Sequence, residues 1–213
     1  MYAKTTISRD DMIDCMQCGE RRTAASVKRR DNWGLINDDP LEDSRRQTVG
    51  YIGELAVSRY FGTEMQREVN LFKKPDVIVG NFGIQVKASE WARNLIIRPD
   101  AKDHEPYVLV LVEMPQGDPR TWEKTLPKNA KATATIVGWM FPYEARELAR
   151  EFPDLERDPG RRSPAIFIPR EMLHPIRHLR ELTQTPKNVY NIEGRRRNGS
   201  EQSSGQGRRR KGR

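Results

Sequence analysis

Three polar residues whose side chains suit phosphodiester chemistry lie close together in the segment 74–87, KPDVIVGNFGIQVK. Two β-prone runs flank a turn rich in Gly and Asn, which predicts a β-hairpin. Because successive side chains of a strand point to opposite faces, Gln85 and Lys87 share one face of the second strand. The hairpin returns that strand to the start of the first, so we expect Asp76, Gln85 and Lys87 to converge at one edge of a sheet.

These residue types fit a magnesium-dependent phosphodiesterase site. Mg²⁺ prefers oxygen ligands in octahedral geometry and keeps several of its waters. Asp76 can supply a carboxylate, Gln85 an amide oxygen and Val86 a backbone carbonyl. Lys87 can hold the attacking water and offset charge that develops on the phosphate, either as a general base or as a fixed cation. The alternative is a solvated strand face, since exposed lysine is common on edge strands.

A second carboxylate, Glu54, lies in the helical segment 49–56, VGYIGELA. Gly50 and Gly53 weaken this helix, and their benefit would be a close approach of the helix to the sheet. That approach would bring Glu54 over the hairpin as a metal ligand. The alternative is that Glu54 points to solvent from a helix end.

The elements that must position these residues follow from periodicity, caps and breakers. The expected elements are helices over 8–30, from about 44 to Gly62, over 143–151 and over 171–182, strands over 107–112, 133–140 and 165–168, and a loop over 31–43. The strand at 107–112 is apolar throughout and should be buried on both faces. Cys15 and Cys18 should be core residues of the first helix, because a closed zinc site needs four ligands. This order predicts an α/β fold in which a central mixed sheet is flanked by helices.

From about residue 44 to residue 140 the sequence resembles the PD-(D/E)XK nuclease superfamily. The resemblance rests on a helical Glu, Pro75-Asp76, and the QxK triplet that ends at Lys87, a variant that is similar to Mrr-type restriction endonucleases. The segment 166–173 looks like the closing elements of phage-type members. The resemblance implies a restriction-endonuclease-like fold, Mg²⁺ or Mn²⁺ as cofactor and DNA as substrate. It implies that Glu54 and Asp76 bind the metal, that Gln85 is a neutral ligand and that Lys87 is catalytic. Gln85 replaces the usual acid, which removes one negative charge from the metal site.

Charge is concentrated at the C-terminal end of the chain. The formal net charge of the 213 residues is +8, and residues 194–213 contribute +7 of it through eight basic residues and one acidic residue. The other 193 residues hold 30 basic and 29 acidic groups. We therefore expect one nuclease-like domain over 1–185, with 8–43 as an N-terminal helical extension, and a disordered Arg-rich tail over 186–213. The tail segment 194–213 should contact the nucleic-acid backbone.

Further candidates for contact with DNA surround the hairpin. The basic ones are Arg59, Arg67, Lys73, Lys74, Arg93 and Arg98. Trp33 and Trp91 could stack on bases or sugars, although tryptophan more often anchors a core or a surface. Ser89 could touch a phosphate, but a hydroxyl at a strand end more often caps the local backbone. His104 could contact substrate, but a loop histidine is more often structural.

The leading hypothesis is a Mg²⁺-dependent DNA endonuclease. A catalytically weak or inactive nuclease-fold DNA-binding protein is the alternative that Gln85 keeps open, and an RNA-binding protein with a dominant Arg/Gly tail ranks last. A homodimer would suit cleavage of both strands, but the sequence shows no dedicated dimer element. The absence of a membrane-length apolar run and of a signal peptide predicts a cytoplasmic protein with no membrane partner, in the host cytoplasm if a phage encodes it.

Overall fold

The computed structural model describes residues 2–30, 40–67, 74–157 and 164–184. The chain divides into two units, Met1–Thr183 and Gln184–Arg213. The described helices and strands belong to the first unit, except that Gln184 is the last residue of a helix. The basic tail, most of the expected loop over 31–43, Trp33 and Lys73 lie outside the described residues.

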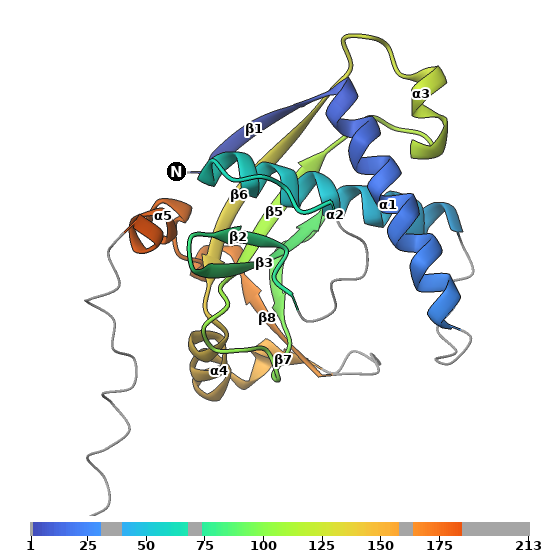
Figure 1. The fold of residues 1–213 in the computed structure, drawn as a ribbon. Helices are drawn as coiled ribbons and strands as arrows, with labels where there is room; N and C mark the ends of the chain where they lie inside the picture. The colour runs from blue at the N-terminus through green and yellow to red at the C-terminus, as the bar shows by residue number, and fades with distance from the viewer. Residues whose placement is uncertain (1, 31–39, 68–73, 158–163, 185–213) are drawn as a thin grey trace, which may run out of the picture. The chain divides into compact units, whose positions relative to one another are not determined.

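A curled mixed sheet forms the centre of the fold (Figure 1). Its five strands have the order β1-β6-β5-β3-β2. Their bounds are β1 Ala3–Ser8, β2 Val77–Val79, β3 Phe82–Ser89, β5 Tyr107–Glu113 and β6 Lys131–Met140. Strands β3 and β5 are parallel and the other pairs are antiparallel. A smaller antiparallel sheet has the order β4-β8-β7 and the bounds β4 Asn94–Ile97, β8 Ala165–Pro169 and β7 Glu156–Arg157.

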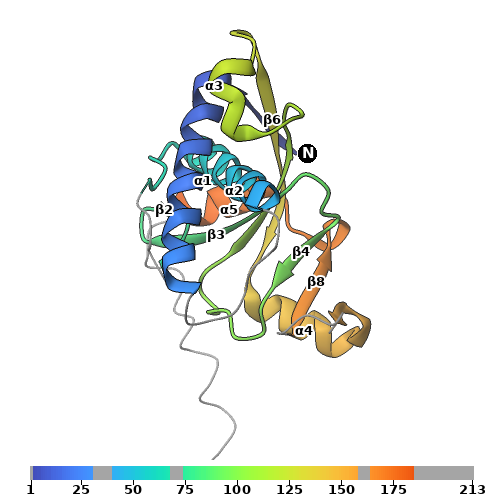
Figure 2. The same ribbon diagram turned by 90° about the vertical axis from the view of Figure 1, so that its right-hand side faces the viewer.

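Helices flank the central sheet, as the sequence predicts. The helices are α1 Arg9–Arg30, α2 Pro40–Phe61, α3 Trp122–Thr125, α4 Pro142–Glu151 and α5 Ile176–Gln184, with 3-10 turns at Pro119–Thr121, Pro153–Leu155 and Arg170–Met172. Figure 2 shows α1 and α2 on one side of the sheet, with β4, β8 and α4 on the other. In the described residues, no helix combines the length and the apolar character needed to cross a membrane.

Strand β5 separates two apolar cores. Val108, Val110 and Val112 belong to the core beneath α1 and α2, whereas Leu109 belongs to the core shared with β4, β8 and α4. All four side chains are buried. The prediction of a strand buried on both faces is therefore confirmed.

The first helix begins and packs as its sequence predicts. The backbone N–H of Asp11 donates to Ser8 Oγ at 3.2 Å, and the N–H of Ser8 donates to Asp11 Oδ2 at 3.0 Å, which is a reciprocal cap. Cys15 and Cys18 are buried beside Met12 and carry free thiols. Their assignment to the core is confirmed.

Helix α2 starts earlier than the sequence pattern predicts. It begins at Pro40 rather than near Ser44, so the last residues of the expected loop are helical. Proline suits the first turn of a helix because its φ is already close to the helical value. An N–H group at that position would have no partner within the helix, so its absence costs nothing. The negative charges of Glu42 and Asp43 in the same turn interact favourably with the positive end of the helix dipole and stabilise the start of the helix. The expected end is confirmed, because α2 stops at Phe61 and the next residue is a glycine with a φ of 70°.

Three other elements differ from expectation. Strand β1 is an addition to the expected elements, and it forms because Ala3–Ser8 can pair along β6. The sequence favours a hairpin turn over residues 80–83, but the turn is tighter, since β3 already begins at Phe82. In place of the expected helix over 171–182, the structure has a 3-10 turn followed by α5. Pro175 disfavours the helical backbone conformation of the preceding residue, His174, which pairs instead with the backbone of Trp139.

The close approach of α2 to the sheet occurs at one of the two expected glycines. A Cβ at Gly53 would lie 2.5 Å from the Cβ of Ala88 on β3 and 3.4 Å from Cγ1 of Val86. A Cβ at Gly50 would meet no atom within 4 Å. The expectation is therefore confirmed for Gly53 and wrong for Gly50, which borders open space.

We predict that Gly53→Ala destabilises the protein by about 1–3 kcal/mol, because the added methyl forces α2 away from β3. Gly50→Ala is the matched control on the same helix, and it should gain about 0.5–1 kcal/mol from the better helix propensity of alanine. Urea unfolding of both variants measures the difference. Equal free energies of unfolding for the two variants would contradict this packing.

Candidate active site

The candidate site lies where strand β2 stops along β3. Val77–Val79 pair with Phe82–Ile84, and beyond Ile84 no described strand continues along this edge of β3. Asp76 takes over at that point. Its backbone N–H donates to the Ile84 carbonyl at 3.0 Å, and its Oδ2 accepts the N–H of Val86 at 2.7 Å. A carboxylate thus replaces the next rung of the ladder.

Two local features fix Asp76 in this place. Pro75 packs against Gly83 so closely that a Cβ on Gly83 would lie 2.6 Å from Pro75 Cγ. The turn between the strands uses Gly80 at a φ of 58°, a conformation that glycine adopts without strain. The Pro-Asp pair therefore enters the hairpin in one position.

The backbone carbonyl of Val86 opens toward the same edge. The N–H and C=O groups of one strand residue point to the same side, and the Val86 N–H points to Asp76. Gln85 and Lys87 direct their backbone groups to the opposite side, where Gln85 N–H bonds the Pro106 carbonyl at 2.9 Å. The Val86 carbonyl therefore points to the same edge as Asp76.

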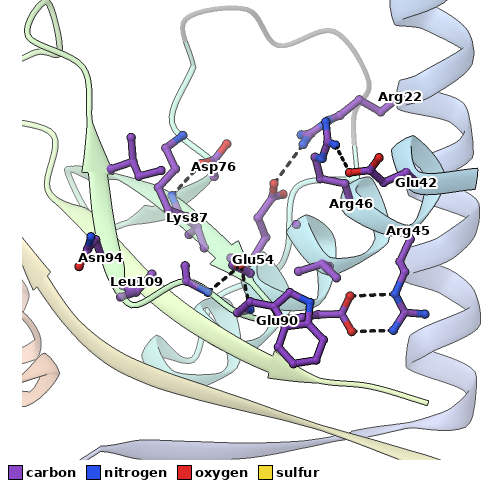
Figure 3. Close-up of a pocket in the computed structure, with 18 residues that line it drawn as sticks. Arg22, Glu42, Arg45, Arg46, Glu54, Asp76, Lys87, Glu90, Asn94 and Leu109 are labelled. Atoms are coloured by element: carbon purple, nitrogen blue, oxygen red, sulfur yellow. Dashed lines mark hydrogen bonds and ion pairs between the residues drawn. The ribbon is translucent and has the colours of Figure 1, made fainter. Parts of the chain in front are cut away.

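Glu54 reaches this edge from α2 (Figure 3). The residue is only 4% exposed. Arg22 from α1 donates Nη1 to Glu54 Oε1 at 3.2 Å, and the guanidinium carbon of Arg22 lies 4.4 Å from the centre of the Tyr51 ring. The alternative in which Glu54 points to solvent is thereby excluded.

Burial raises the pKa of both carboxylates. Burial raises the pKa of Glu54 to about 8, with a further contribution from the charge of Asp76, while Arg22 and Lys87 act in the opposite direction. Burial also raises the pKa of Asp76, against the lowering effects of the Val86 N–H, Lys87 and Arg22. Two buried acids that resist ionisation together form a site that an added cation would stabilise.

Lys87 lines the cleft beside these acids, and its side chain is exposed. Its Nζ lies 5.4 Å from the centre of the Tyr107 ring. Within the described residues, no carboxylate forms an ion pair with it. Lys87 therefore presents a cation to the cleft that a substrate phosphate can meet.

Gln85 shares a strand face with Lys87, but the structure does not place it in the lining of the cleft. Its Nε2 donates to Glu105 Oε2 at 3.2 Å and to the Lys74 carbonyl at 3.5 Å. Glu105 is 8% exposed and also accepts from Lys102 Nζ at 2.5 Å. Because its nitrogen is engaged by a carboxylate, the oxygen of the Gln85 amide is the atom left for another partner.

Sequence reasoning missed Glu105 and Arg22. Glu105 precedes β5, the strand that pairs in parallel with β3, and its charge contributes to the raised pKa of Asp76. A charged residue next to the start of a fully apolar strand was the available signal. Arg22 had no such signal, because only the packing of α1 on α2 brings it to Glu54.

The cleft has a volume of about 640 Å³. Basic side chains contribute strongly to its walls, namely Arg22, Arg45, Arg46 and Lys87. Arg45 is held by both oxygens of Glu90, at 2.8 and 2.6 Å.

Other candidates from the sequence have structural partners. Arg59 pairs with Asp11 at 2.6 Å, and Arg67 pairs with Asp14 at 3.1 Å. Ser89 Oγ accepts backbone N–H groups two and three residues ahead, at 3.1 and 3.0 Å, as a local cap does. The candidates that remain exposed are Lys74, Trp91, Arg93, Arg98 and His104.

The donor set fits a Mg²⁺ ion that keeps most of its waters. In the described part of the chain, no group of three or more His, Cys, Asp and Glu side chains is arranged around a common metal position. Mg²⁺ commonly uses only one or two carboxylates and takes its other oxygens from water and substrate. Glu54, Asp76 and the Val86 carbonyl meet that requirement, and the burial that raises the pKa of both acids is a cost that a bound cation would offset.

Comparison of the chain with family models, with curated proteins and with solved structures finds no match. The residues of the cleft and their geometry are therefore the basis on which a function is proposed below.

We predict that Glu54→Gln raises the stability of the metal-free protein in alkaline solution. The acid has a pKa of 4.5 when unperturbed and about 8 in the fold, so wild-type stability falls as the pH rises between these values. Glutamine does not ionise and avoids this loss. In EDTA, the melting temperature of Glu54→Gln should therefore exceed that of the wild type by an amount that grows from pH 4.5 to pH 8.

Glu113→Gln, at an exposed acid on β5, is the control and should show no comparable divergence. Mg²⁺ added at the alkaline end should stabilise the wild type more than Glu54→Gln, because binding to the folded state adds stability. A difference between wild type and Glu54→Gln that does not change with pH would refute the assignment.

We further predict that Gln85→Glu destabilises the protein, because two carboxylates would then meet where Gln85 and Glu105 now share a hydrogen bond. The swap Gln85→Glu with Glu105→Gln restores the pair with its ends exchanged and should recover most of the loss. Urea unfolding in EDTA gives the coupling, expected at about 1–3 kcal/mol. Additive effects of the two substitutions would show that the contact is unimportant.

Proposed function

We propose that this protein is a Mg²⁺-dependent deoxyribonuclease, an endonuclease of the PD-(D/E)XK superfamily with a restriction-endonuclease-like fold. The observation that carries the proposal is the meeting of a buried carboxylate, Glu54, and a half-buried carboxylate, Asp76, with the cation of Lys87 in one open cleft. Glu54 and Asp76 lie 33 and 11 positions before Lys87 in the chain, and structural need alone does not explain why the three converge.

The order of elements supports the superfamily assignment. Helix α2 carries Glu54, the hairpin β2–β3 carries Asp76 and Lys87, and the buried strand β5 runs parallel to β3. This is the order in which the resemblance expects the site to be built. The Pro75-Asp76 pair stands at the mouth of the hairpin and the QxK triplet lies inside β3.

Asp76, Glu54 and the Val86 carbonyl would hold the Mg²⁺ ion. A bound ion would polarise the scissile phosphate and lower the pKa of a coordinated water. The protein keeps the ligands in place, since the Val86 N–H fixes one oxygen of Asp76 and Arg22 fixes one oxygen of Glu54. In each carboxylate the second oxygen remains for the metal.

Lys87 supplies the positive charge opposite the acids. Held on a central strand, its ammonium can bind a phosphate oxygen and stabilise the charge that increases there in the transition state. It can also orient the attacking water. Gln85 lies two residues before Lys87 on the same strand face, outside the lining of the cleft, and Glu105 orients its amide.

One contact favours the alternative of a DNA-binding protein without catalysis. Arg22 already neutralises part of the charge of Glu54, at 3.2 Å. If Arg22 substituted for the metal, the cleft would bind DNA through its cations and would not cleave it. Cleavage assays separate the two functions.

We predict metal-dependent cleavage of supercoiled plasmid or of a linear single strand by the wild-type protein, in Mg²⁺ or Mn²⁺ and not in EDTA. Asp76→Ala removes a ligand and Lys87→Ala removes the cation, and each should lower the rate by about 100-fold or more. Lys124→Ala, at an exposed lysine of α3 that does not line the cleft, is the matched control and should cleave at the wild-type rate. Binding without cleavage in every metal would favour the alternative.

A further inference from the structure

Trp91 is the most exposed of the large apolar side chains that the structure describes, at 82%. It also forms part of the wall of the cleft that contains Glu54, Asp76 and Lys87. A single exposed apolar residue is common on protein surfaces and needs no function. Trp91 differs from an ordinary exposed residue because it lines this cleft and because hydrogen bonds hold its backbone in place.

The segment around Trp91 is fixed on both sides. Ser89 Oγ accepts the N–H of Trp91 at 3.1 Å and the N–H of Ala92 at 3.0 Å. Glu90 is bound by Arg45 through two hydrogen bonds, and Arg45 Nη1 also donates to the Gly117 carbonyl at 3.0 Å. The indole is thus presented from a braced backbone, which lowers the ordering cost of binding a partner.

The surface next to Trp91 suits a flat, partly polar ligand. Apolar side chains of the cleft come from two central strands and from the segment that follows Trp91, namely Val86, Ala88, Ala92, Ile96 and Leu109. Asn94 adds one side-chain amide, which has no hydrogen-bond partner in the described residues. An apolar lining with an aromatic wall and one amide has the chemistry of a nucleobase pocket.

The part of the cleft that holds Lys87 suits a phosphate. Lys87 presents its cation there, beside the carboxylates that would hold a metal ion. The volume of about 640 Å³ is in the range of pockets that bind small organic groups. A base beside Trp91 would therefore place its own backbone near the catalytic residues.

We propose that Trp91 stacks on an unpaired nucleobase and that the substrate is single-stranded DNA, or a single-stranded segment of DNA. Bases inside a duplex are stacked on one another, so their faces are open to an indole only in a single strand or after extrusion from the helix. The choice of DNA as ligand rests on the proposed function. The preference for unpaired bases rests on Trp91 and its support.

The test measures DNA binding by fluorescence anisotropy in EDTA, with the full-length protein. The ligands are an oligothymidine, the same oligonucleotide with abasic residues, and a blunt duplex hairpin. Trp91→Ala should weaken binding of the oligothymidine by about 5- to 100-fold, because stacking on one aromatic ring contributes that much. Trp91→Phe keeps a ring and should retain most of the affinity.

The abasic oligonucleotide isolates the stacking contact. It keeps the phosphates and lacks the bases, so wild type and Trp91→Ala should bind it equally. Phe152→Ala, at an aromatic residue that is 44% exposed and does not line the cleft, is the control and should bind every ligand as the wild type does. Raised salt weakens the phosphate contacts of wild type and variant alike, so the fold-effect of Trp91→Ala should stay the same while both affinities fall.

Three outcomes would overturn the inference. Trp91→Ala could bind the oligothymidine as tightly as the wild type, or it could lose affinity for the hairpin and the oligothymidine equally. It could also change only the sedimentation of the protein, which would make Trp91 a protein contact. Because binding is measured without metal, Trp91-dependent binding with no cleavage in Mg²⁺ would refute the nuclease proposal alone.

Discussion

The contact between helix α2 and strand β3 at Gly53 and Ala88 is the constraint on which the rest of the site depends. A side chain at residue 53 would meet the strand at a distance that no Cβ normally reaches, so only glycine allows α2 to lie this low on the sheet. The next residue is Glu54, and this approach buries its carboxylate at the sheet edge. Because Gly53 has no Cβ, the helix lies close to the strand, and Glu54 is therefore part of the cleft.

Burial of two acids at one edge has an electrostatic cost. Glu54 and Asp76 each lose hydration, which raises the pKa of both, and a nearby charge adds to the rise, that of Asp76 for Glu54 and that of Glu105 for Asp76. The fold compensates only partly, through Arg22, Lys87 and the Val86 N–H. Residual strain of this kind is unfavourable for stability and is typical of sites that bind a cation or transfer a proton.

The shortness of β2 opens the site to a ligand. Pairing with β2 ends at Ile84. The free edge of the later residues of β3, and side chains from both faces of that strand, are therefore open to the same cleft. Side chains from opposite faces, such as Val86 and Lys87, can therefore line one cavity. The braced turn at Ser89 continues that cavity to Trp91, so the two carboxylates, the cation of Lys87 and the exposed ring line one cleft.

Local sequence determined the elements that carry the site. Alternation and turn residues predicted the hairpin with Gln85 and Lys87 on one face, Ser8 and Asp11 predicted the start of α1, and Gly62 predicted the end of α2. These signals lie within a few neighbouring residues, where sterics and hydrogen bonding act without the rest of the chain.

Tertiary structure alone decided which side chains meet. Arg22 reaches Glu54 across 32 residues and Glu105 reaches Gln85 across 20, and neither pair has a pattern that local periodicity can reveal. The pairing of β1 with β6, and the assignment of Gly53 but not Gly50 to the helix–sheet contact, likewise depend on how α1 and α2 pack on the sheet. The sequence by itself determined faces and turns, because these depend on adjacent residues. The folded chain determined the partners of each charge, because burial and distance exist only once the distant elements are packed together.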